Sequence, residues 1–187
     1  MVHFSLFPTP VGTCGIAWGP NGILAVTLPE ANEDRTRVRL LRRLPTARRA
    51  AAPPAVQQVI DDIVALLHGE SRDLRQAPLD LQGIPKFAQR VYAVARTIAP
   101  GCTLSYGEVA ALCGDRNQAR AVGQALGSNP FPIIVPCHRV LAAGGRSGGF
   151  SAPGGVVTKL RLLQLEGWPR GSPQSGTLAG GNLALPF

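Results

Sequence analysis

The sequence predicts an α+β protein: a small N-terminal domain of β-meander and helices, followed by a mainly helical domain with a helix-turn-helix and a strand-loop that carries a reactive cysteine. The first 30 residues contain three strand-like runs separated by turn formers. From about residue 83 onward, apolar residues recur at helical spacing. An apolar run at 131–135, which we expect to be the end of a buried strand, then leads into Pro-Cys-His-Arg-Val at 136–140. This pentapeptide is hard to explain by packing alone.

The change of pattern sets the expected domain boundaries. Residues 1–82 form the N-terminal α+β domain, and residues 83–169 form the second domain. Residues 170–187 are rich in Gly, Pro and Ser, so we expect a disordered tail.

The N-terminal domain begins with a predicted meander. Strand-like runs lie at 2–7, 13–18 and 23–28, and turn formers occupy 9–12 and 19–22. Successive strands joined by such short turns pair antiparallel.

Two helices and a short extended segment at 72–82 complete this domain. The first helix is expected over 32–44, and its arginine-rich outer face is interpreted as solvated surface. Pro53-Pro54 opens the second helix, because proline is tolerated in a first turn. The residues expected to face inward from the two helices are Val38, Leu41, Leu44, Val56, Val59, Ile60, Ile63 and Leu67.

The second domain begins with an amphipathic helix that ends before Pro100-Gly101. Ser105 and Glu108 then form a capping box at the start of a short helix, and Gly114 stops that helix. Another short helix is expected over 118–126. Two short helices joined by a glycine-containing turn are typical of a helix-turn-helix. The amphipathic helix before Pro100-Gly101 is expected to face inward through Phe87, Val91, Val94, Ala95 and Ile98.

The helix at 118–126 has a surface of small residues, Ala119, Ala121 and Gly123, with one long basic side chain, Arg120. Small residues let a helix backbone lie close to another surface. Packing on a neighbouring helix is the ordinary explanation, but the charge of this region favours nucleic acid.

Charge is distributed unevenly along the chain, which has a formal net charge of +8. Residues 1–82 contain nine Lys/Arg and eight Asp/Glu, whereas residues 83–187 contain ten and three, giving +7. A polyanion such as nucleic acid is therefore the expected partner of the second half. A GC-rich genome would explain the preference for arginine, but not the imbalance between the halves.

Composition excludes several other classes. The chain has 187 residues and no apolar stretch near the roughly 18 residues that a membrane helix needs, so we expect no membrane partner. The N-terminus does not resemble a signal peptide, so a cytoplasmic location is expected. Cys14, Cys102 and Cys113 are interpreted as small apolar filler, and no pair of cysteines has CxxC spacing. Without such spacing we expect no metal site.

Cys137 has the surroundings of an activated nucleophile. Pro136 fixes φ and removes a backbone donor, so the chain leaves regular structure at the thiol. His138 and Arg139 add positive charge nearby, which is expected to favour the thiolate.

Five ordered motifs together resemble the O6-alkylguanine-DNA alkyltransferases. The resemblance spans about residues 83–167, and the N-terminal meander is consistent with it. The pentapeptide is the most specific motif in this context. The motifs are Ser-Tyr-Gly-Glu at 105–108, Ala-Arg-Ala-Val-Gly at 119–123, Asn129-Pro130, the pentapeptide at 136–140, and Leu-Leu-Gln-Leu-Glu-Gly at 162–167.

This resemblance implies direct repair of double-stranded DNA containing O6-alkylguanine, with O4-alkylthymine as a further substrate to consider. A monomer would flip the damaged base out of the duplex, and a cysteine would take the alkyl group irreversibly, once per molecule and without a cofactor. Residues 83–169 would then be a DNA-binding alkyltransferase domain whose helix-turn-helix sits in the minor groove.

The resemblance also assigns roles to residues. Cys137 would be the nucleophile, His138 its base through a bridging water, and Glu166 the group that orients His138. Tyr106 would donate a proton toward the leaving guanine, and Asn129 would hold the turn before the cysteine. The substrate pocket would contain Val140, Phe150, Ser151 and Lys159, with the carbonyls of Cys137 and Val140 and the Ser151 backbone facing the base. DNA would be bound by Arg120, which would fill the gap in the base stack, and by Ser105, Ala119, Ala121 and Gly123.

Three departures from the family pattern stand out. Phe150 replaces the commoner tyrosine, and Ala152-Pro153 stands where closer glycines are expected, so the accepted size of alkyl group is open. Residues 100–102 also differ, without an expected effect on the chemistry.

Three other functions are compatible with parts of the pattern. A damage sensor of the same fold would bind lesions without reacting, but such sensors lack the cysteine. A transcriptional regulator would use the helix-turn-helix, and the sequence shows no added regulatory domain. A cysteine hydrolase would need a cysteine and histidine that can pair, and such pairs usually come from distant segments.

Overall fold

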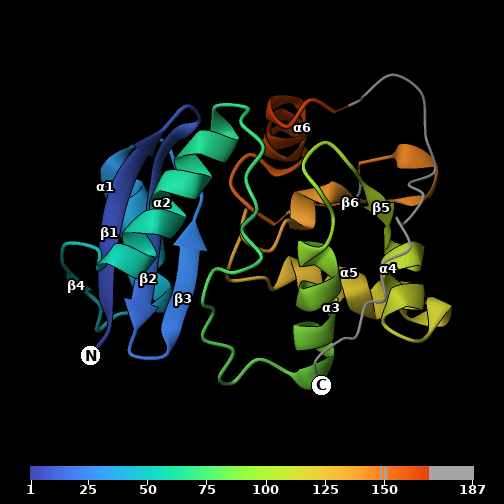
Figure 1. Ribbon diagram of the computed structural model, residues 1–187, viewed down its shortest axis with the longest axis horizontal. Coiled ribbons are helices and arrows are strands. Elements are labelled where there is room, and N and C mark those ends of the chain that lie inside the picture. The colour runs from blue at the N-terminus through green and yellow to red at the C-terminus, as the bar shows by residue number, and fades with distance from the viewer. Residues whose placement is uncertain (148, 150, 169–187) are drawn as a thin grey trace.

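The computed structural model describes residues 1–147, 149 and 151–168, and its N-terminal part is a sheet covered on both faces by helices (Figure 1). The strands β1 (His3–Thr9), β2 (Gly12–Gly19) and β3 (Gly22–Thr27) form the predicted antiparallel meander. A two-residue strand, β4 (Arg48–Arg49), adds in parallel to β1 and gives the order β3-β2-β1-β4.

The two faces of the sheet are buried against different helices. Cys14, Ile16 and Trp18 of β2 lie in the same apolar cluster as α2 (Pro54–Leu67), whereas Ala17 packs in a smaller cluster with Leu40 of α1 (Glu33–Arg43). Successive strand residues point to opposite faces, so β2 carries apolar side chains on both faces.

The expectation for α1 is partly wrong. Asn32 caps the helix by accepting from the amide of Arg35, as a helix start requires. Val38, expected to face inward, is 44% exposed, and Thr36 and Leu40 are the buried residues. Thr36 and Leu40 are four residues apart and share one face, which places Val38 on the opposite side. All the inward residues expected of α2 are buried.

A loop segment connects the two halves and covers the edge of β3. Residues 78–80 run beside this strand, where the amide of Ile23 donates to Pro78 at 2.7 Å and the amide of Asp80 donates to Ile23 at 2.8 Å. The carbonyl of Pro130 accepts from the amide of Val26 at 2.8 Å. These contacts satisfy an edge that would otherwise expose unpaired backbone groups.

The second half is mainly helical (Figure 1). Ser105 and Glu108 make both hydrogen bonds of the predicted capping box. A continuous apolar cluster joins this half to the sheet, and Tyr92 meets Phe131 edge to face within it. The elements are α3 (Lys86–Arg96), β5 (Leu104–Ser105), α4 (Tyr106–Leu112), the 3-10 turn η1 (Arg116–Gln118), α5 (Ala119–Gly127), the 3-10 turns η2 (Cys137–Arg139) and η3 (Ala143–Gly145), β6 (Val140–Leu141) and α6 (Gly155–Leu165).

The strand predicted at 131–135 does not form. This run is a buried tight turn in which the amide of Val135 donates to Phe131 at 2.8 Å, and Ile133 adopts a φ of +75°. Pro130, Pro132 and Pro136 lack the amide hydrogens that a strand would donate, so a ladder cannot extend through them. The apolar character of the run reflects burial in the core.

Two other expectations are modified. Cys102 is exposed, so it is not apolar filler, whereas Cys14 is buried and Cys113 is half-buried as expected. The predicted tail at 170–187 lies outside the described residues. Among the helices that the structure describes, none is long and apolar enough to cross a membrane.

Replacing Gly22 by alanine should destabilise the fold by about 1–3 kcal/mol or more. Gly22 has a φ of +134°, and an added Cβ would lie 2.6 Å from the carbonyl oxygen of Pro78. The free energy of unfolding, measured by urea denaturation, tests this.

Gly127→Ala is the matched control, because an added Cβ there meets nothing within 4 Å at the end of α5. This variant should be neutral or stabilised by up to about 1 kcal/mol. Equal losses of unfolding free energy in the two variants would contradict this explanation, in which the positive φ of Gly22 and the nearby Pro78 carbonyl require glycine.

Candidate active site

Cys137 lies where the buried turn meets η2. Its amide donates to the carbonyl of Val135 at 2.8 Å, and its side chain is buried with 9% of the residue exposed. Directly after η2, β6 pairs in parallel with β5, so Val140 lies opposite Leu104. The thiol is therefore held between two fixed backbone segments, beside the start of α4.

The thiol of Cys137 is not ionised, although the residues next to it in sequence predict that it would be. Burial raises the pKa of Cys137 above its usual range, while the Asn129 side chain and the charge of Lys159 lower it in part. The expectation that His138 and Arg139 favour the thiolate is wrong, because both side chains are directed to Glu166. In the resting protein Cys137 is a thiol, so a nucleophilic reaction requires a base.

A buried network joins His138, Glu166 and Arg139. Nε2 of His138 lies 2.8 Å from Oε1 of Glu166, and Arg139 binds the same carboxylate through Nε at 2.9 Å and Nη2 at 2.8 Å. The second amino group of Arg139 donates to the carbonyl of Ile98. All three side chains are almost completely buried. Residues 138 and 139 reach the end of α6 because η2 packs against that helix.

The charges in this network can be assigned from its contacts. Burial alone would raise the pKa of Glu166, but its contacts with His138 and Arg139 outweigh burial and lower it to about 2. Burial lowers the pKa of His138, and Glu166 opposes this effect only in part. A carboxylate accepts hydrogen bonds and does not donate, so the neutral imidazole carries its proton on Nε2.

That tautomer leaves Nδ1 of His138 as a free acceptor. Nδ1 is buried and has no hydrogen-bond partner among the described residues. A buried polar atom without a partner is costly and uncommon in native proteins. The histidine next to the thiol therefore presents an unused lone pair.

Asn129 closes the turn that leads to the cysteine. Its Nδ2 donates to the carbonyl of Val135 at 2.9 Å, and its Oδ1 accepts from the amide of Phe131 at 2.9 Å. The Asn129 side chain thereby ties the end of α5 to the turn. It also lowers the pKa of the Cys137 thiol, which burial raises.

Tyr106 and Lys159 come together near Cys137 from α4 and α6. Burial raises the pKa of Tyr106, and Cys137 raises it further, so the phenol stays protonated. Nζ of Lys159 lies 5.8 Å from the centre of the Tyr106 ring. The same Nζ donates to the carbonyl of Val140 at 2.6 Å, and Lys159 is completely buried.

The remaining predicted residues lie around α4 and α5. Ser105 caps α4, and Gly123 faces the ring of Tyr106, where an added Cβ would lie 3.8 Å away. Arg120 is exposed, whereas Ala119 and Ala121 are half-buried. Ser151 donates from its hydroxyl to the carbonyl of Gly127 at 2.8 Å, which holds the loop before α6 against the end of α5. Phe150 lies outside the described residues.

Arg139 is the residue whose role the sequence did not reveal. Its place in the pentapeptide indicated a charge near sulfur, whereas the structure gives it two hydrogen bonds to Glu166. The sequence does contain an arginine in an apolar segment, Arg139, and a glutamate after the last helix, Glu166. Their spacing along the chain does not show that the two side chains meet. No group of three potential metal-ligating side chains occurs in the part of the chain that the structure describes.

Glu166→Gln should destabilise the protein by about 3–5 kcal/mol at neutral pH, because it leaves the buried charge of Arg139 without a counter-ion. The low pKa of Glu166 adds a pH dependence. Its stabilising contribution is complete above pH 4.5, the usual value for this group, and is lost as pH falls toward about 2. Urea denaturation at several pH values should therefore show wild type and variant converging as pH falls through this window.

Glu33→Gln is the control, because Glu33 is 55% exposed in its ion pair with Arg49. It should change stability by less than about 1 kcal/mol at any pH. A difference between wild type and Glu166→Gln that stays constant from pH 7 to pH 3 would contradict the assignment of an ionised Glu166.

Comparison with known proteins agrees with the motifs. A family model described as 6-O-methylguanine DNA methyltransferase, DNA binding domain, matches residues 86–168. The methylated-DNA–protein-cysteine methyltransferase of Methanothermobacter thermautotrophicus is 35% identical over 158 residues, covering 84% of this chain and 81% of that protein. The protein of the same name from Mycobacterium tuberculosis is 37% identical over 166 residues, covering 89% and 93%.

A solved structure shows the same similarity in three dimensions. The crystal structure of Mycobacterium tuberculosis OGT in complex with DNA matches with a TM-score of 0.70 and 35% identity, covering 88% of this chain and 92% of that chain. The mixed α+β architecture is thus shared with a protein of known structure. The resemblance inferred from five short motifs is confirmed, and this chain belongs to the family of methylated-DNA–protein-cysteine methyltransferases.

Proposed function

We propose that this protein repairs double-stranded DNA by moving the alkyl group of O6-alkylguanine to the sulfur of Cys137, once per molecule. O4-alkylthymine is a second candidate substrate. The observation that carries the proposal is the pairing of a buried thiol with a histidine whose Nε2 is fixed by a carboxylate and whose Nδ1 is free. This arrangement is suited to removing one proton from one thiol.

The proton and the electrons can be followed through the site. The Cys137 thiol gives its proton to Nδ1 of His138 through a bridging water, and Glu166 stabilises the imidazolium that forms. The sulfur attacks the alkyl carbon, and the bond between that carbon and O6 breaks with its electron pair going to guanine. Tyr106 donates a proton to the departing base, and the proton taken from the thiol balances this transfer.

Transfer of the alkyl group to sulfur is favoured because it removes a negative charge from a buried site. The thiolate forms only transiently, because burial raises the pKa of Cys137, and Lys159 is the cation that lowers it. Attack converts the thiolate into a neutral thioether, which is more stable than the anion in a buried site. A thioether has no acidic proton and is a poor leaving group, so the cysteine is consumed.

The backbone near Cys137 can also recognise the base. The carbonyl of Val140 already accepts from Lys159 at 2.6 Å, and the carbonyl of Cys137 accepts from the amide of Val140. Each carbonyl has a second lone pair, which we propose accepts from the guanine amino group. The backbone amide of Ser151 would donate to O6, and Phe150 would form the apolar wall for the alkyl group.

DNA would be bound by the helix-turn-helix formed by α4 and α5. The exposed Arg120 would enter the stack where the flipped base was, and the half-buried Ala119 and Ala121 would let α5 approach the minor groove closely. The net charge of +7 in residues 83–187 supports binding through phosphates, which is independent of sequence. We assign these functions to a domain of residues 83–169 that acts as a monomer, with residues 1–82 as a separate domain.

Intact mass after incubation with duplex DNA containing O6-methylguanine tests the proposal. The protein should gain one methyl group and stop, and Cys137→Ala should gain none while still binding the DNA. Cys113→Ala is the matched control and should gain the methyl group at the wild-type rate. Binding without a mass change would indicate a damage sensor, and continued turnover would indicate a hydrolase.

His138→Gln should slow methyl transfer by about 100-fold or more at neutral pH, because the base is lost. The variant should recover part of its rate as pH rises and the thiol ionises without help. Wild type should depend less on pH above 6.5, because burial lowers the pKa of His138 and leaves the base free. Single-turnover rates between pH 6 and 9.5 check this, and parallel profiles for the two proteins would exclude His138 as the base.

A further inference from the structure

Tyr92 is a buried tyrosine of α3 that no step of the proposed reaction uses. It is 3% exposed, and burial raises the pKa of its phenol to about 12, so the hydroxyl keeps its proton. The hydroxyl donates to the carbonyl of Ala125 in α5 at 3.1 Å. The ring meets Phe131 edge to face, with the ring centres 6.3 Å apart. One side chain therefore contacts the chain on both sides of Asn129.

The hydroxyl contact fixes the end of α5. The last carbonyls of a helix have no donor within the helix and need partners from elsewhere. The carbonyl of Ala125 accepts from the amide of Ser128 at 3.3 Å, which is long for a backbone hydrogen bond. The phenol of Tyr92 is a closer donor and comes from a different helix. It therefore holds the last turn of α5 directly before Asn129.

The ring contact acts on the turn that follows Asn129. Phe131 is fully buried, and its amide donates to Oδ1 of Asn129 at 2.9 Å. Nδ2 of the same asparagine donates to the carbonyl of Val135 at 2.9 Å, and this carbonyl also accepts from the amide of Cys137 at 2.8 Å. A continuous series of contacts thus runs from Tyr92 through Asn129 to the backbone of Cys137.

Asn129 also acts on the sulfur itself. Burial is the main influence on the pKa of Cys137 and raises it, and the hydrogen bond from Asn129 is the largest of the effects that lower it. A donor has this effect only while it stays within hydrogen-bond reach of the sulfur. A small displacement of the turn at 129–135 would therefore make the thiolate harder to form.

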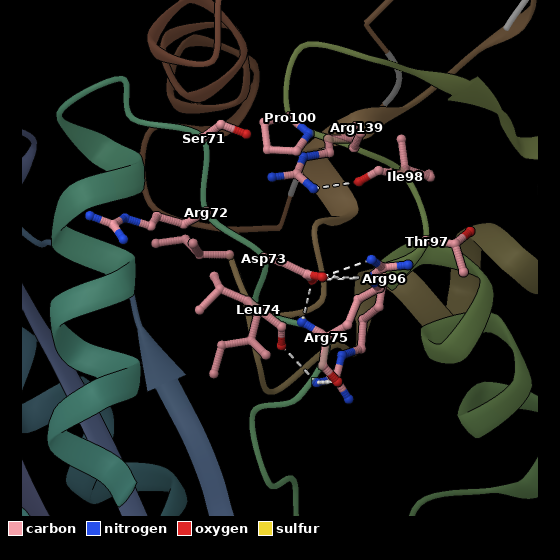
Figure 2. A pocket seen from close by; sticks show the side chains of 13 residues that line it. Ser71, Arg72, Asp73, Leu74, Arg75, Arg96, Thr97, Ile98, Pro100 and Arg139 are labelled. Atoms are coloured by element: carbon pink, nitrogen blue, oxygen red, sulfur yellow. Dashed lines mark hydrogen bonds and ion pairs between the residues drawn. The ribbon is translucent and has the colours of Figure 1, made fainter. Parts of the chain in front are cut away.

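α3 is a fixed support for Tyr92. Near the end of this helix, Nη2 of Arg96 donates to three carbonyls of the preceding segment, those of Leu74, Arg75 and Ala77 (Figure 2). Directly after the helix, the carbonyl of Ile98 accepts from Arg139, which also binds Glu166 (Figure 2). The helix is thus tied to the network around Glu166 at its end and to the cysteine turn through Tyr92.

We propose that Tyr92 is a positioning residue for alkyl transfer, whose hydroxyl and ring hold the chain on both sides of Asn129 so that Asn129 stays in contact with Cys137. The role in transfer rests on the proposed function, whereas the role in holding the turn does not. An apolar side chain would fill the same space in the core, so packing alone does not require the hydroxyl.

Amide hydrogen exchange in the protein without DNA tests whether Tyr92 holds the turn. Tyr92→Phe keeps the ring and removes only the hydroxyl. The amide of Phe131, which is bonded to Asn129, should then exchange about 3-fold faster or more, because opening of the turn no longer breaks the phenol hydrogen bond. Tyr92→Leu removes the ring contact as well and should accelerate this exchange further.

Thr97→Val is the matched control. It also removes one hydroxyl from the end of α3, but this hydroxyl donates within its own helix, to the carbonyl of Val94 at 2.7 Å. Exchange at the amide of Phe131 should stay at the wild-type rate in this variant. Equal exchange at Phe131 in Tyr92→Phe and Thr97→Val would overturn the proposal.

Single-turnover transfer from duplex DNA containing O6-methylguanine tests the role in the reaction. At saturating DNA, Tyr92→Phe should slow transfer by about 3-fold or more. The Kd for the duplex should stay within about 2-fold of wild type, because Tyr92 is buried and does not reach the surface. A variant that loses structure in general would instead lose binding and transfer together.

A double-mutant cycle identifies the residue through which Tyr92 acts. In an Asn129→Ala background, Tyr92→Phe should cause no further slowing, because the side chain that it positions is absent. Unchanged transfer in Tyr92→Phe, or the same slowing with and without Asn129, would rule out the positioning role. A wild-type protein that gains no methyl group would contradict the proposed function, and the exchange measurement would still decide whether Tyr92 holds the turn.

Discussion

The carboxylate of Glu166 is the group on which the rest of the site depends. His138 and Arg139 belong to one 3-10 turn, and both side chains donate hydrogen bonds to this carboxylate at the end of α6. Arg139 keeps the carboxylate ionised in a buried place, and the carboxylate in turn fixes the tautomer of His138. A buried ion pair of this kind is weak evidence for stability in general. Here the ion pair matters because it sets which nitrogen of the His138 imidazole is free to accept a proton.

The backbone around Cys137 is shaped by prolines and by one asparagine. Prolines at 130, 132 and 136 prevent the apolar run from joining a sheet, and Asn129 supplies two hydrogen bonds that close the resulting turn. Ile133 has a positive φ, which is rare for a β-branched residue and is tolerated because the core surrounds it. The cysteine is thus presented from a rigid turn, as a reaction that depends on close positioning requires.

The sheet contributes to the site although no predicted site residue lies on it. The carbonyl of Pro130 accepts from Val26 of β3, so the turn before the cysteine is pinned to the edge of the meander. The segment at 78–80 covers the same edge, and Arg96 holds the preceding residues against α3 through three carbonyls. One apolar cluster passes through both halves. Movement of the sheet relative to the helices would therefore disturb the turn that carries the thiol.

Local sequence patterns were enough to predict the three strands of the meander, the main helices and the chemical types in the site. Period-two runs with turn formers located the meander, the capping box located α4, and the residue types at 106, 129, 137, 138 and 166 identified a family. These features are local, because they depend on propensity and on spacing within a few residues. For Arg139, in contrast, the neighbouring sequence predicts the wrong partner, and for the run at 131–135 hydrophobicity predicts the wrong conformation. Helical spacing also predicts the wrong face for Val38.

These three points required the three-dimensional structure, because each depends on which distant groups share a buried space. Whether Arg139 faces sulfur or carboxylate is set by the packing of η2 on α6, which spacing along the chain does not encode. The protonation of Cys137 likewise follows from burial, which outweighs the neighbouring positive charge that the sequence displays. An apolar run is buried in a turn as readily as in a strand, so hydrophobicity alone does not choose between them.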